Sequence, residues 1–465
     1  MFSTTVPGLF DPSDTRPVHF LGIGGAGMSA LALAARRRGV VVTGCDVDDT
    51  AFADLRAAGA TVHRGVDVAH LDGVRAVVVT AAARADHPEL VAAHERGIAV
   101  VPRKVALAEL VNGHTVVALA GTHGKTTTTV MTTEALRAAG MRPSGLAGGR
   151  VAAWGGNAHL DGDRLWVVEA DEYDQAFLTL EPTIAVINNV EADHLECYGS
   201  VEAMEAAFVT FASRARRVLV GTADAGSDRI ASAVGATTTR FGLEDVPGIR
   251  LVPRSRDAAG SVAECHFPDG SVVTLRLAVP GIHNLRNAAA ALGVVHALDG
   301  DLDAAAEALG TFSGVGRRFE RLGDASGVTF IDDYAHHPTE LAATLEAAAQ
   351  AFPGRRLVAV FQPHLFSRTR EHAAAMGAAL VRADVAVVSD VYPAREDPIP
   401  GVTGALVADA ARQAGATEVH YVPARDGLDR AVADLATDGD VVLTLGAGDV
   451  TRVGPAVQRM LRGDG

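Results

Sequence analysis

Three features of the sequence predict an α/β fold with three domains. Strand-like apolar runs alternate with alanine-rich helical stretches nearly throughout, a pattern typical of parallel sheets covered by helices. The chain has 465 residues, and domains of about 100–200 residues are usual. Two separate strand–glycine loop–helix units begin near residues 18 and 114. We therefore expect mostly parallel sheets with one small antiparallel segment.

The first domain, residues 1–112, is predicted to be Rossmann-like. The strand in VHFL is followed by a glycine loop and by a helix that starts at Met28, and a second strand, VVVTGCD, ends on Asp46. The pattern continues through AVVVTAA and IAVVP. The dipeptide Asn112-Gly113 marks a turn at the end of this domain.

The central domain, residues 113–313, starts with the strand TVVALAG, which enters a second glycine loop and a helix. Further strands, LWVVEA and TIAVINN, end at acidic or amide residues. From about Arg217 to Leu277 shorter strands alternate with turn residues, which indicates a more antiparallel segment. The helix in GIHNLRNAAAALGVVHAL closes this domain.

The third domain, residues 314–465, follows a hinge predicted at Ser313 to Leu322. Its strands VTFIDDYAHHP, LVAVFQPH, VAVVSDVYP and VVLTLGAG are each followed by a helical pattern. This alternation predicts a second Rossmann-like domain.

Composition and charge exclude several classes of function. Apolar residues make up 48% and charged residues 21% of the chain, the balance of a soluble protein with filled cores. The net charge of −15 argues against nucleic acid as a partner, because a phosphate backbone needs a basic surface. An anionic substrate must then be held by backbone N–H groups, a few Arg or Lys residues, or metal ions.

Cysteine spacing and the N-terminal residues indicate the cellular compartment in which the protein is expected. Cys45, Cys197 and Cys265 lie far apart without a CxxC pair, which predicts neither a disulfide framework nor a structural zinc site. No secretory signal is visible, and the longest apolar runs are too short to span a bilayer. We therefore expect a cytoplasmic protein without membrane insertion.

The strongest motif is a predicted phosphate-binding loop. It comprises Gly121, Thr122, His123, Gly124, Lys125, Thr126 and Thr127, between a strand and a helix. Glycines let backbone N–H groups point at phosphate oxygens, and the helix N-terminus adds positive potential. Lys125 is expected to reach the β- and γ-phosphates, and the Thr126 hydroxyl to bind Mg²⁺. The central domain is therefore predicted to be P-loop ATPase-like; a glycine-rich turn with an incidental lysine is the alternative.

Two acidic clusters, EADE at residues 169–172 and EADH at residues 191–194, follow strands. Ligands of such sheets bind at the carboxyl ends of strands, so both clusters should lie at the same edge as the phosphate loop. Mg²⁺ prefers oxygen ligands, so Glu169 and Thr126 suit one ion, and His194 with a carboxylate could hold a second. Helix-capping acids with a structural histidine are the alternative.

A second glycine loop matches GxGxxG. It comprises Gly22, Gly24, Gly25, Ala26, Gly27 and Met28, with Asp46 about twenty residues later. The motif indicates a loop suited to a pyrophosphate, which NAD and UDP-sugars both carry. Because two nucleotide loops lie on two domains, we expect two nucleotide ligands, one of them a substrate.

Histidines and arginines follow strands of the third domain. His336, His337 and Arg368 suit a small carboxylate, since Arg binds carboxylates in bidentate fashion, although a helix-start turn and a solvated basic face are equally compatible. Arg318, beside Arg317 at the hinge, could reach phosphates. Asn284 and Asn287 lie one helical turn apart and could recognise adenine or merely cap the helix.

Together these residues resemble the Mur ligases, a three-domain family that joins amino acids to UDP-N-acetylmuramate derivatives. The motifs occur in the family's order from about Val18 to Gly448: GIGGAGM, GTHGKTTTT, EADE, NNVEADH, GIHNLRNA, GRRFE, DDYAHHPTE and FQPHLFSRTR. GIGGAGM and the His within GTHGKTT resemble the L-alanine-adding branch. The resemblance implies a ligase of peptidoglycan synthesis that uses ATP and Mg²⁺, which Mn²⁺ could replace, with UDP-N-acetylmuramate and L-alanine as substrates; a monomer and a dimer both remain open.

The resemblance also implies residue roles. Thr126 and Glu169 would bind one Mg²⁺ and His194 the second; Lys125 and the loop would hold ATP, with Asn284 and Asn287 near adenine. Gly22 to Met28 would hold the UDP pyrophosphate. The sugar would lie near Gly148, Gly149 and Asn157, and alanine near Tyr334, His336 and Arg368. Either His194 or His336 would be the base that deprotonates the amine.

Two positions depart from the wider family. Related ligases keep a carbamylated lysine about fifteen residues after the metal-binding histidine, whereas Phe208 to Phe211 offers none, as expected of the alanine-adding branch. The second metal must therefore find other ligands. Leu365 stands where the motif can carry a basic residue.

Three other functions would each explain part of the sequence. A salvage ligase that adds a whole tripeptide to the same sugar nucleotide shares GTHGKTT and DDYAHHP, but its first loop should be less glycine-rich. An NAD(P)-dependent oxidoreductase explains only the first domain. A non-catalytic nucleotide switch leaves the third domain's histidines and arginines unexplained.

Overall fold

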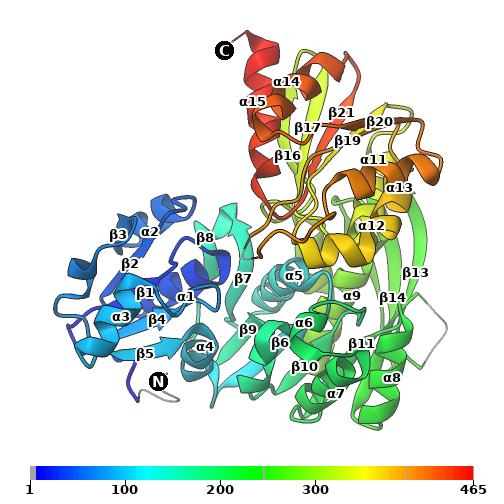
Figure 1. The fold of residues 1–465 in the computed structure, drawn as a ribbon. Helices are drawn as coiled ribbons and strands as arrows, with labels where there is room; N and C mark the ends of the chain where they lie inside the picture. The colour runs from blue at the N-terminus through cyan, green and yellow to red at the C-terminus, as the bar shows by residue number, and fades with distance from the viewer. Residues whose placement is uncertain (1–6, 244–246, 395, 464–465) are drawn as a thin grey trace. The chain divides into compact units, whose positions relative to one another are not determined.

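The computed structural model describes residues 7–243, 247–394 and 396–463 and has an α/β fold (Figure 1). Its strands form three sheets, which contain five, ten and six strands. The chain divides into two compact units. One comprises Met1–Pro253, Ala263–Arg276 and Leu285–Phe312, and the other comprises Arg254–Val262, Leu277–Asn284 and Ser313–Gly465. Within the described residues, no helix combines the length and the hydropathy that crossing a membrane would need.

The first sheet is entirely parallel, in the order β3-β2-β1-β4-β5. Its elements are β1 (Val18–Leu21), α1 (Ala26–Arg37), β2 (Val42–Asp46), α2 (Phe52–Ala57), β3 (Thr61–Arg64), the 3-10 helix η1 (Val68–Leu71), β4 (Ala76–Val79), α3 (Pro88–Glu95), β5 (Ala99–Pro102) and α4 (Arg103–Val111). Phe20 and Val78 belong to the same core cluster as α1, whereas Leu21 and Val77 pack with α3 on the other face.

The helix after the first glycine loop begins at Ala26, two residues before the predicted start at Met28. Gly25 is the N-cap residue and has an extended backbone, with φ −62° and ψ 141°. Glycine is an accepted N-cap residue, so the helix can begin inside the glycine motif, before the motif ends at Met28. The N-terminus of α1 is therefore part of the glycine motif itself.

The second sheet has ten strands, in the order β15-β14-β13-β12-β11-β10-β6-β9-β7-β8. Its strands are β6 (Thr115–Ala120), β7 (Ser144–Val151), β8 (Gly156–His159), β9 (Leu165–Glu169), β10 (Ile184–Ile187), β11 (Arg217–Gly221), β12 (Thr238–Gly242), β13 (Gly248–Asp257), β14 (Gly260–His266) and β15 (Val272–Leu277). The helices connected with it are α5 (Lys125–Ala138), η2 (Ala152–Trp154), η3 (Tyr173–Thr179), α6 (Leu195–Tyr198), α7 (Val201–Ala212), α8 (Ala225–Val234), α9 (Ile282–Ala297) and α10 (Leu302–Gly310).

The antiparallel pairing differs in part from the prediction. From about Arg217 to Leu277 we expected a more antiparallel segment, but the pairs β10–β11, β11–β12 and β12–β13 are parallel. Helix α8 supplies the crossover that a parallel pair requires between β11 and β12. An antiparallel pair occurs between β7 and β8, where two glycines with positive φ, Gly155 and Gly156, allow a tight return.

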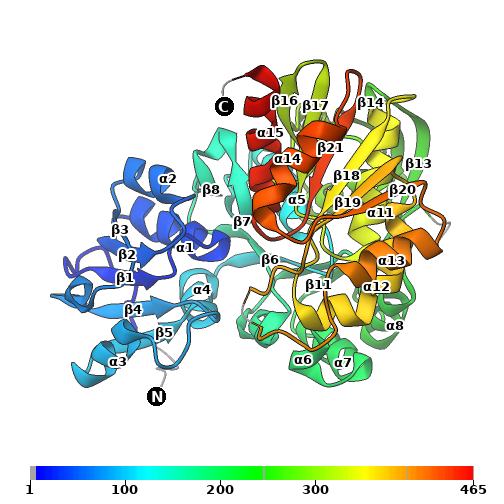
Figure 2. The same cartoon turned by 45° about the horizontal axis from the view of Figure 1, so that its top comes forward.

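The third sheet has the order β16-β17-β21-β18-β19-β20, and only β16 pairs antiparallel. Its elements are β16 (Glu320–Ala325), β17 (Val328–Asp333), α11 (Pro338–Ala351), β18 (Leu357–Phe361), α12 (Phe366–Leu380), β19 (Val385–Val388), α13 (Ala405–Gln413), β20 (Glu418–Tyr421), α14 (Arg425–Leu435), β21 (Val441–Leu445), η4 (Asp449–Arg452) and α15 (Val453–Arg462). Helices α11, α12 and α13 cover one face and α14 and α15 the other (Figure 2).

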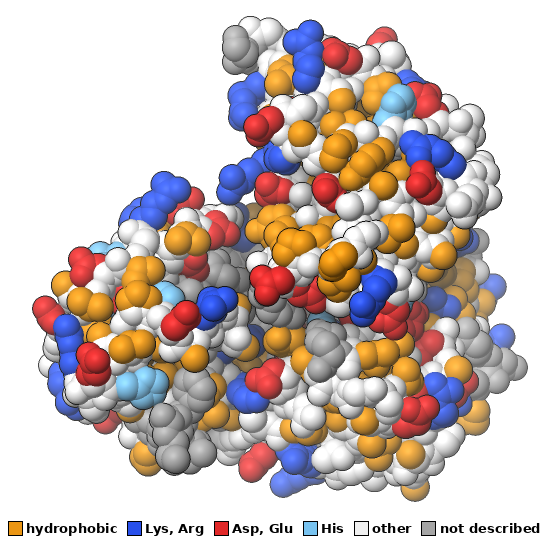
Figure 3. All heavy atoms as spheres, viewed as in Figure 1, with side chains coloured by type: hydrophobic (Ala, Val, Ile, Leu, Met, Phe, Trp, Pro, Cys, Tyr) orange, Lys and Arg blue, Asp and Glu red, His pale blue; other side chains and the backbone are white. Residues whose placement is uncertain are grey.

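Charged side chains of both signs are interspersed on the face shown in Figure 3. Red acidic and blue basic side chains alternate with orange apolar ones over the elements of both units. Such mixing, with a net charge of −15, leaves anion binding to individual side chains and loops rather than to a broad basic area.

Candidate active site

The predicted phosphate-binding loop lies between the carboxyl end of β6 and the start of α5. Gly121 and Gly124 have φ angles of 131° and 78°, which residues with side chains rarely adopt. A Cβ atom on Gly124 would also come within 2.6 Å of Oδ1 of Asn287. The loop therefore needs glycine at these positions. It leads directly into the first turn of α5, where N–H groups and the helix dipole favour an anion.

Residues after β10 fix the conformation of this loop. Oδ1 of Asn189 accepts a hydrogen bond from the N–H of His123 at 2.7 Å, and Nδ2 of Asn188 donates to the carbonyl oxygen of His123 at 3.3 Å. The Thr122 hydroxyl donates to the carbonyl oxygen of Glu191 and accepts from its N–H, at 3.1 and 2.9 Å. The loop is therefore held in shape before any ligand binds. Asn188 and Asn189 were not among the predicted site residues, although two amides at the end of a strand are visible in TIAVINN.

Lys125 is held in a buried ion pair. Its Nζ atom lies 2.7 and 2.8 Å from the two carboxylate oxygens of Glu172 and donates to the carbonyl oxygen of Gly121 at 2.6 Å. Burial alone would lower the pKa of Lys125, but the surrounding carboxylates, Glu172 first, outweigh it and raise the pKa above its usual value. Lys125 therefore carries a full positive charge at the phosphate loop.

The two candidate ligands of the first metal ion lie on adjoining elements. The Thr126 hydroxyl is in the first turn of α5, and that residue is buried. Glu169 ends β9, which pairs with β6, and its carboxylate accepts a hydrogen bond from the N–H of Gly148 on β7. A Cβ atom on Gly148 would lie 2.7 Å from that carboxylate, so glycine there makes room for Glu169.

His194, the predicted ligand of the second ion, precedes α6. Its backbone is left-handed, with φ 55°, and its ring packs edge-on against Tyr173 with centroids 5.2 Å apart. Nε2 of His194 lies 3.8 Å from a carboxylate oxygen of Asp193. Within the described ranges, neither His194 nor Glu169 belongs to a cluster of three or more potential ligands.

The first-domain glycine loop is tied to Asp46. The N–H of Gly24 donates to Oδ2 of Asp46 at 2.8 Å. A Cβ atom on Gly24 would lie 2.2 Å from the carbonyl oxygen of Asp48, and one on Gly22 would lie 2.8 Å from the Thr80 side chain. Asp46 therefore fixes the loop conformation at the start of α1.

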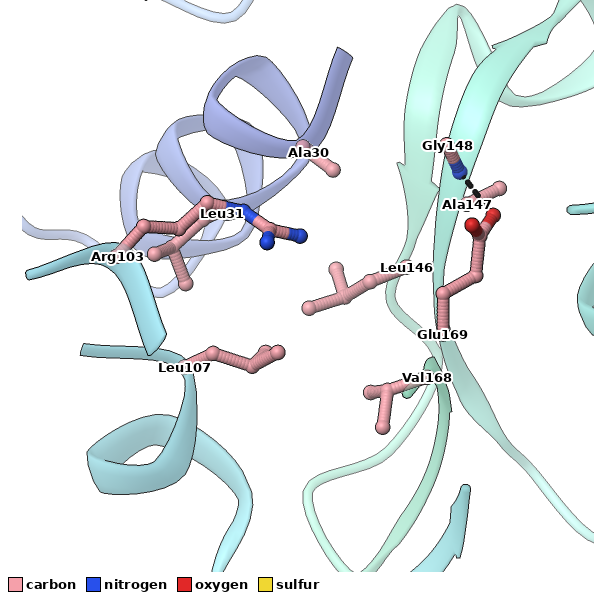
Figure 4. Close-up of a pocket in the computed structure, with 10 residues that line it drawn as sticks. Ala30, Leu31, Arg103, Leu107, Leu146, Ala147, Gly148, Val168 and Glu169 are labelled. Atoms are coloured by element: carbon pink, nitrogen blue, oxygen red, sulfur yellow. Dashed lines mark hydrogen bonds between the residues drawn. The ribbon is translucent and has the colours of Figure 1, made fainter. Parts of the chain in front are cut away.

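A pocket connects this loop with Glu169 (Figure 4). Its empty volume is about 330 Å³, and its lining residues are Gly27, Ala30, Leu31, Arg103, Leu107, Leu146, Ala147, Gly148, Val168 and Glu169. The guanidinium of Arg103 extends toward the pocket, and a Cβ atom on Gly27 would lie 2.5 Å from its Nη2 atom. Nε of Arg103 is buried and makes no hydrogen bond. The sequence analysis missed this cation because it follows a strand without any motif.

Asn157, predicted to approach the sugar, anchors α1. Its Nδ2 atom donates to the carbonyl oxygen of Ala26 at 2.6 Å and to the Ser29 hydroxyl at 3.0 Å. The amide therefore links β8 to the helix that carries the glycine motif. Gly149, predicted for the same subsite, lies in β7 next to Gly148.

In the second unit, Tyr334 follows β17 directly, and two arginines that precede β16 lie beside its ring. The guanidinium carbons of Arg317 and Arg318 each lie 4.9 Å from the Tyr334 ring centroid. Nε of Arg317 donates to Oδ2 of Asp332 at 3.2 Å, which ties this side chain to β17. Burial raises the pKa of Asp333 to about 6, although Arg318 and the N–H groups of Ala335 and Phe319 oppose the increase. The segment thus concentrates cations beside an aromatic ring.

The predicted alanine-binding residues cluster in the same unit. The His336 ring lies 5.3 Å from that of Tyr334 and 6.0 Å from that of His364. Nη1 of Arg368 lies 3.4 Å from Nδ1 of His364, and Arg368 is buried at the start of α12. His337 instead caps α11 in a capping box with Glu340. His364, the histidine of the motif FQPHLFSRTR, precedes Arg368 by four residues.

The paired asparagines of α9 have different surroundings. Nδ2 of Asn284 donates to the carbonyl oxygen of Pro280 at 2.7 Å, a contact of the helix start. Oδ1 of Asn287 lies beside Gly124 of the phosphate loop. Adenine recognition by Asn284 and Asn287 stays a prediction. Of the two, Asn287 is the one that lies next to the phosphate loop.

Three family models match the chain in order. The Mur ligase family catalytic domain matches residues 17–115, the Mur ligase middle domain residues 119–295, and the Mur ligase glutamate ligase domain residues 317–448. Together they account for most of the sequence. The chain belongs to the Mur ligase family. The expected resemblance, the three-domain α/β architecture and the ligase class are thereby confirmed, and ATP use follows from the family.

Curated relatives of this Mur ligase share one name. The proteins from Cutibacterium acnes and Paenarthrobacter aurescens are 46% and 47% identical to it, cover 98% and 96% of this chain and 98% and 97% of their own, and are both named UDP-N-acetylmuramate–L-alanine ligase. A crystal structure of the UDP-N-acetylmuramate–alanine ligase from Thermotoga maritima aligns with a TM-score of 0.83 at 29% identity, over 97% of this chain and 100% of that one.

The predicted site residues of this Mur ligase fall into two groups, one in each compact unit. The phosphate loop, the acidic strand ends and the glycine loop belong to one compact unit, and the Tyr334–Arg368 cluster belongs to the other. The first unit therefore contains the glycine loops and the lysine suited to a nucleotide and a pyrophosphate. The second unit contains the histidines and the arginine suited to a small carboxylate. The roles of the individual residues stay predictions.

Proposed function

We propose that this Mur ligase joins L-alanine to UDP-N-acetylmuramate and converts ATP to ADP and phosphate. The observation that carries the proposal is the shared name of relatives 46% and 47% identical over nearly the full length of both chains. The buried, charged Lys125 at a preshaped phosphate loop supplies the chemistry that such a ligase needs.

In the first step the muramoyl carboxylate is activated. One carboxylate oxygen bonds to the γ-phosphorus, the bond to the β,γ-bridging oxygen breaks, and ADP leaves with that electron pair. The positive charge of Lys125 and the N–H groups at the start of α5 are suited to stabilise the charge on the transferring phosphoryl group. Because the loop is already fixed by Asn188 and Asn189, little reorganisation is needed when ATP binds.

The donors at the strand ends fit a hard divalent cation. The Thr126 hydroxyl and the Glu169 carboxylate offer oxygen atoms, and Gly148 leaves space beside that carboxylate. When bound, Mg²⁺ neutralises charge on the phosphate oxygens. His194 with a carboxylate is the corresponding set for the second ion.

In the second step the amine of alanine attacks the acyl phosphate. A C–N bond forms, the amine passes a proton to a base, and the tetrahedral intermediate collapses as phosphate leaves. Arg368 is suited to hold the alanine carboxylate. His194 and His336 both remain candidates for the base, and each has a ring nitrogen near a carboxylate, of Asp193 and Glu340 respectively.

The test is phosphate release from ATP with Mg²⁺ and UDP-N-acetylmuramate. L-alanine and the L-Ala-D-Glu-diamino-acid tripeptide are compared as acceptors, each with and without the sugar nucleotide. Release that requires both the sugar nucleotide and L-alanine supports the proposal. Release only with the tripeptide would assign the chain to the salvage branch, and release with neither acceptor would overturn both readings.

A further inference from the structure

A second cluster of potential ligands lies in the first sheet, outside the site described above. It consists of His19 on β1, Cys45 on β2, His70 on η1 and Glu89 on α3. Each offers one ligand atom, and all four atoms lie within 4.8 Å of one another. Cys45 belongs to the core cluster that packs with α3, whereas the pocket beside Glu169 is lined from α1, which belongs to a different cluster.

The distances within this cluster are short. Sγ of Cys45 lies 3.0 Å from Oε2 of Glu89, Nε2 of His19 lies 3.5 Å from the same oxygen, and Nδ1 of His70 lies 2.9 Å from Oε1 of Glu89. Zinc bonds of about 2.0–2.3 Å in a tetrahedron place ligand atoms about 3.3–3.8 Å apart. Small side-chain shifts would therefore open the cluster to the size of a zinc ion.

His19 supplies an independent indication of a ligand. The side chain is fully buried, and Nε2 makes no hydrogen bond, although it lies at the ion-pair distance of 3.5 Å from Oε2 of Glu89. The other ring nitrogen, Nδ1, lies 3.0 Å from the Thr43 hydroxyl. Metal-bound histidines characteristically use the second nitrogen for such an orienting contact. A long contact with a carboxylate satisfies a buried ring nitrogen less well than a hydrogen bond or a metal ion between the two groups would.

We propose that His19, Cys45, His70 and Glu89 bind one Zn²⁺ ion. One thiolate, two imidazoles and one carboxylate form a set suited to zinc rather than to Mg²⁺. Binding replaces the S–H proton of Cys45 by a Zn–S bond and releases that proton to solvent. Because four protein ligands leave no open position, the ion is structural and links β1, β2, η1 and α3.

The spacing of these ligands explains why the sequence predicted no zinc site. A CxxC pair brings two ligands from one turn, whereas here four separate elements contribute one ligand each. Parallel pairing of β1 with β2 places His19 and Cys45 on the same face. His70 is 13% exposed, and His63 stacks on its ring with centroids 4.3 Å apart, so the ion would enter from the His70 side.

The test is a Co²⁺ titration of the full-length protein after removal of bound metal with a chelator. We expect a thiolate-to-cobalt charge-transfer band that saturates at one Co²⁺ per chain and disappears when Zn²⁺ is added. The oxygen ligands proposed for Mg²⁺ cannot produce this band, so the result is independent of the ligase reaction. A wild-type protein without the band would overturn the proposal.

Two variants assign the ligands. Cys45→Ser should lose the band, whereas Cys265→Ser, which changes another buried cysteine in β14, should retain it. Zn²⁺ should raise the thermal midpoint of the wild type and of Cys265→Ser but not that of Cys45→Ser. If Cys45→Ser does not fold, Glu89→Gln should weaken Co²⁺ binding at least tenfold. Equal bands in the wild type and in the Cys45 or Glu89 variant would refute the assignment and leave a metal-free polar cluster.

Discussion

At the scale of single residues, the Lys125–Glu172 ion pair is predicted to affect both the stability of the fold and the rate of the reaction. The chain has two lysines, Lys104 and Lys125, and the second is buried against a carboxylate, whereas Lys104 pairs with the exposed Asp174. Lys125→Met should lower the rate of phosphate release about 100- to 1,000-fold, because a preorganised charge is lost. It should also destabilise the protein by about 3–5 kcal/mol, since Glu172 is left buried without its partner.

Two further variants separate these effects. Lys104→Met should change stability by less than about 1 kcal/mol and leave the rate intact, because its ion pair is exposed. The double variant Lys125→Met/Glu172→Gln should regain part of the stability but none of the activity. Phosphate-release kinetics and denaturant titration measure both quantities, and an active Lys125→Met enzyme would remove Lys125 from the phosphate site.

Asp333 should produce a pH-dependent stability. Burial raises its pKa to about 6 in the folded chain, from a usual value of 3.8. Between these values the folded state keeps a proton that the unfolded state has lost, so stability falls as the pH rises from about 4 to about 6. The loss is at most about 3 kcal/mol. Asp333→Asn should flatten the dependence of unfolding free energy on pH in this window; an unchanged slope would contradict the burial effect.

At the scale of elements, the approach of β7 to β9 controls the predicted metal ligand. In Gly148→Ala the new Cβ atom would lie 2.7 Å from the Glu169 carboxylate, which must turn away. Because a flexible side chain can move, the fold should survive, but the Mg²⁺ concentration for half-maximal phosphate release should increase several-fold. Gly427→Ala in α14, where nothing lies within 4 Å, is the control and should stabilise by up to about 1 kcal/mol. Equal Mg²⁺ dependence in both would separate Glu169 from the metal site.

A feature of this molecule can be predicted from the sequence when neighbouring residues determine it, and not when it depends on contacts between distant parts of the chain. The strand–glycine loop–helix units were predictable because Gly22, Gly121 and Gly124 mark backbone conformations with positive φ. The parallel pairing of β12 with β13 was not, because strand direction depends on which strands meet in space. Arg103 was missed for the same reason, since only the folded chain brings it beside Gly27.

At the scale of the whole molecule, the phosphate loop and the predicted alanine-binding residue Arg368 belong to different compact units, so single substitutions should separate the affinities for ATP and L-alanine. Arg368→Ala in the second unit should raise the KM for L-alanine by at least tenfold, because a charge-assisted contact with the carboxylate is lost. ATP affinity, measured by calorimetry, should stay within about twofold, because the phosphate loop belongs to the first unit. Arg382→Ala, which removes a half-exposed ion pair with Glu346 in the same unit, should change neither value. If Arg368→Ala instead weakened ATP binding and left the KM for L-alanine unchanged, the assignment of the carboxylate subsite to α12 would be wrong.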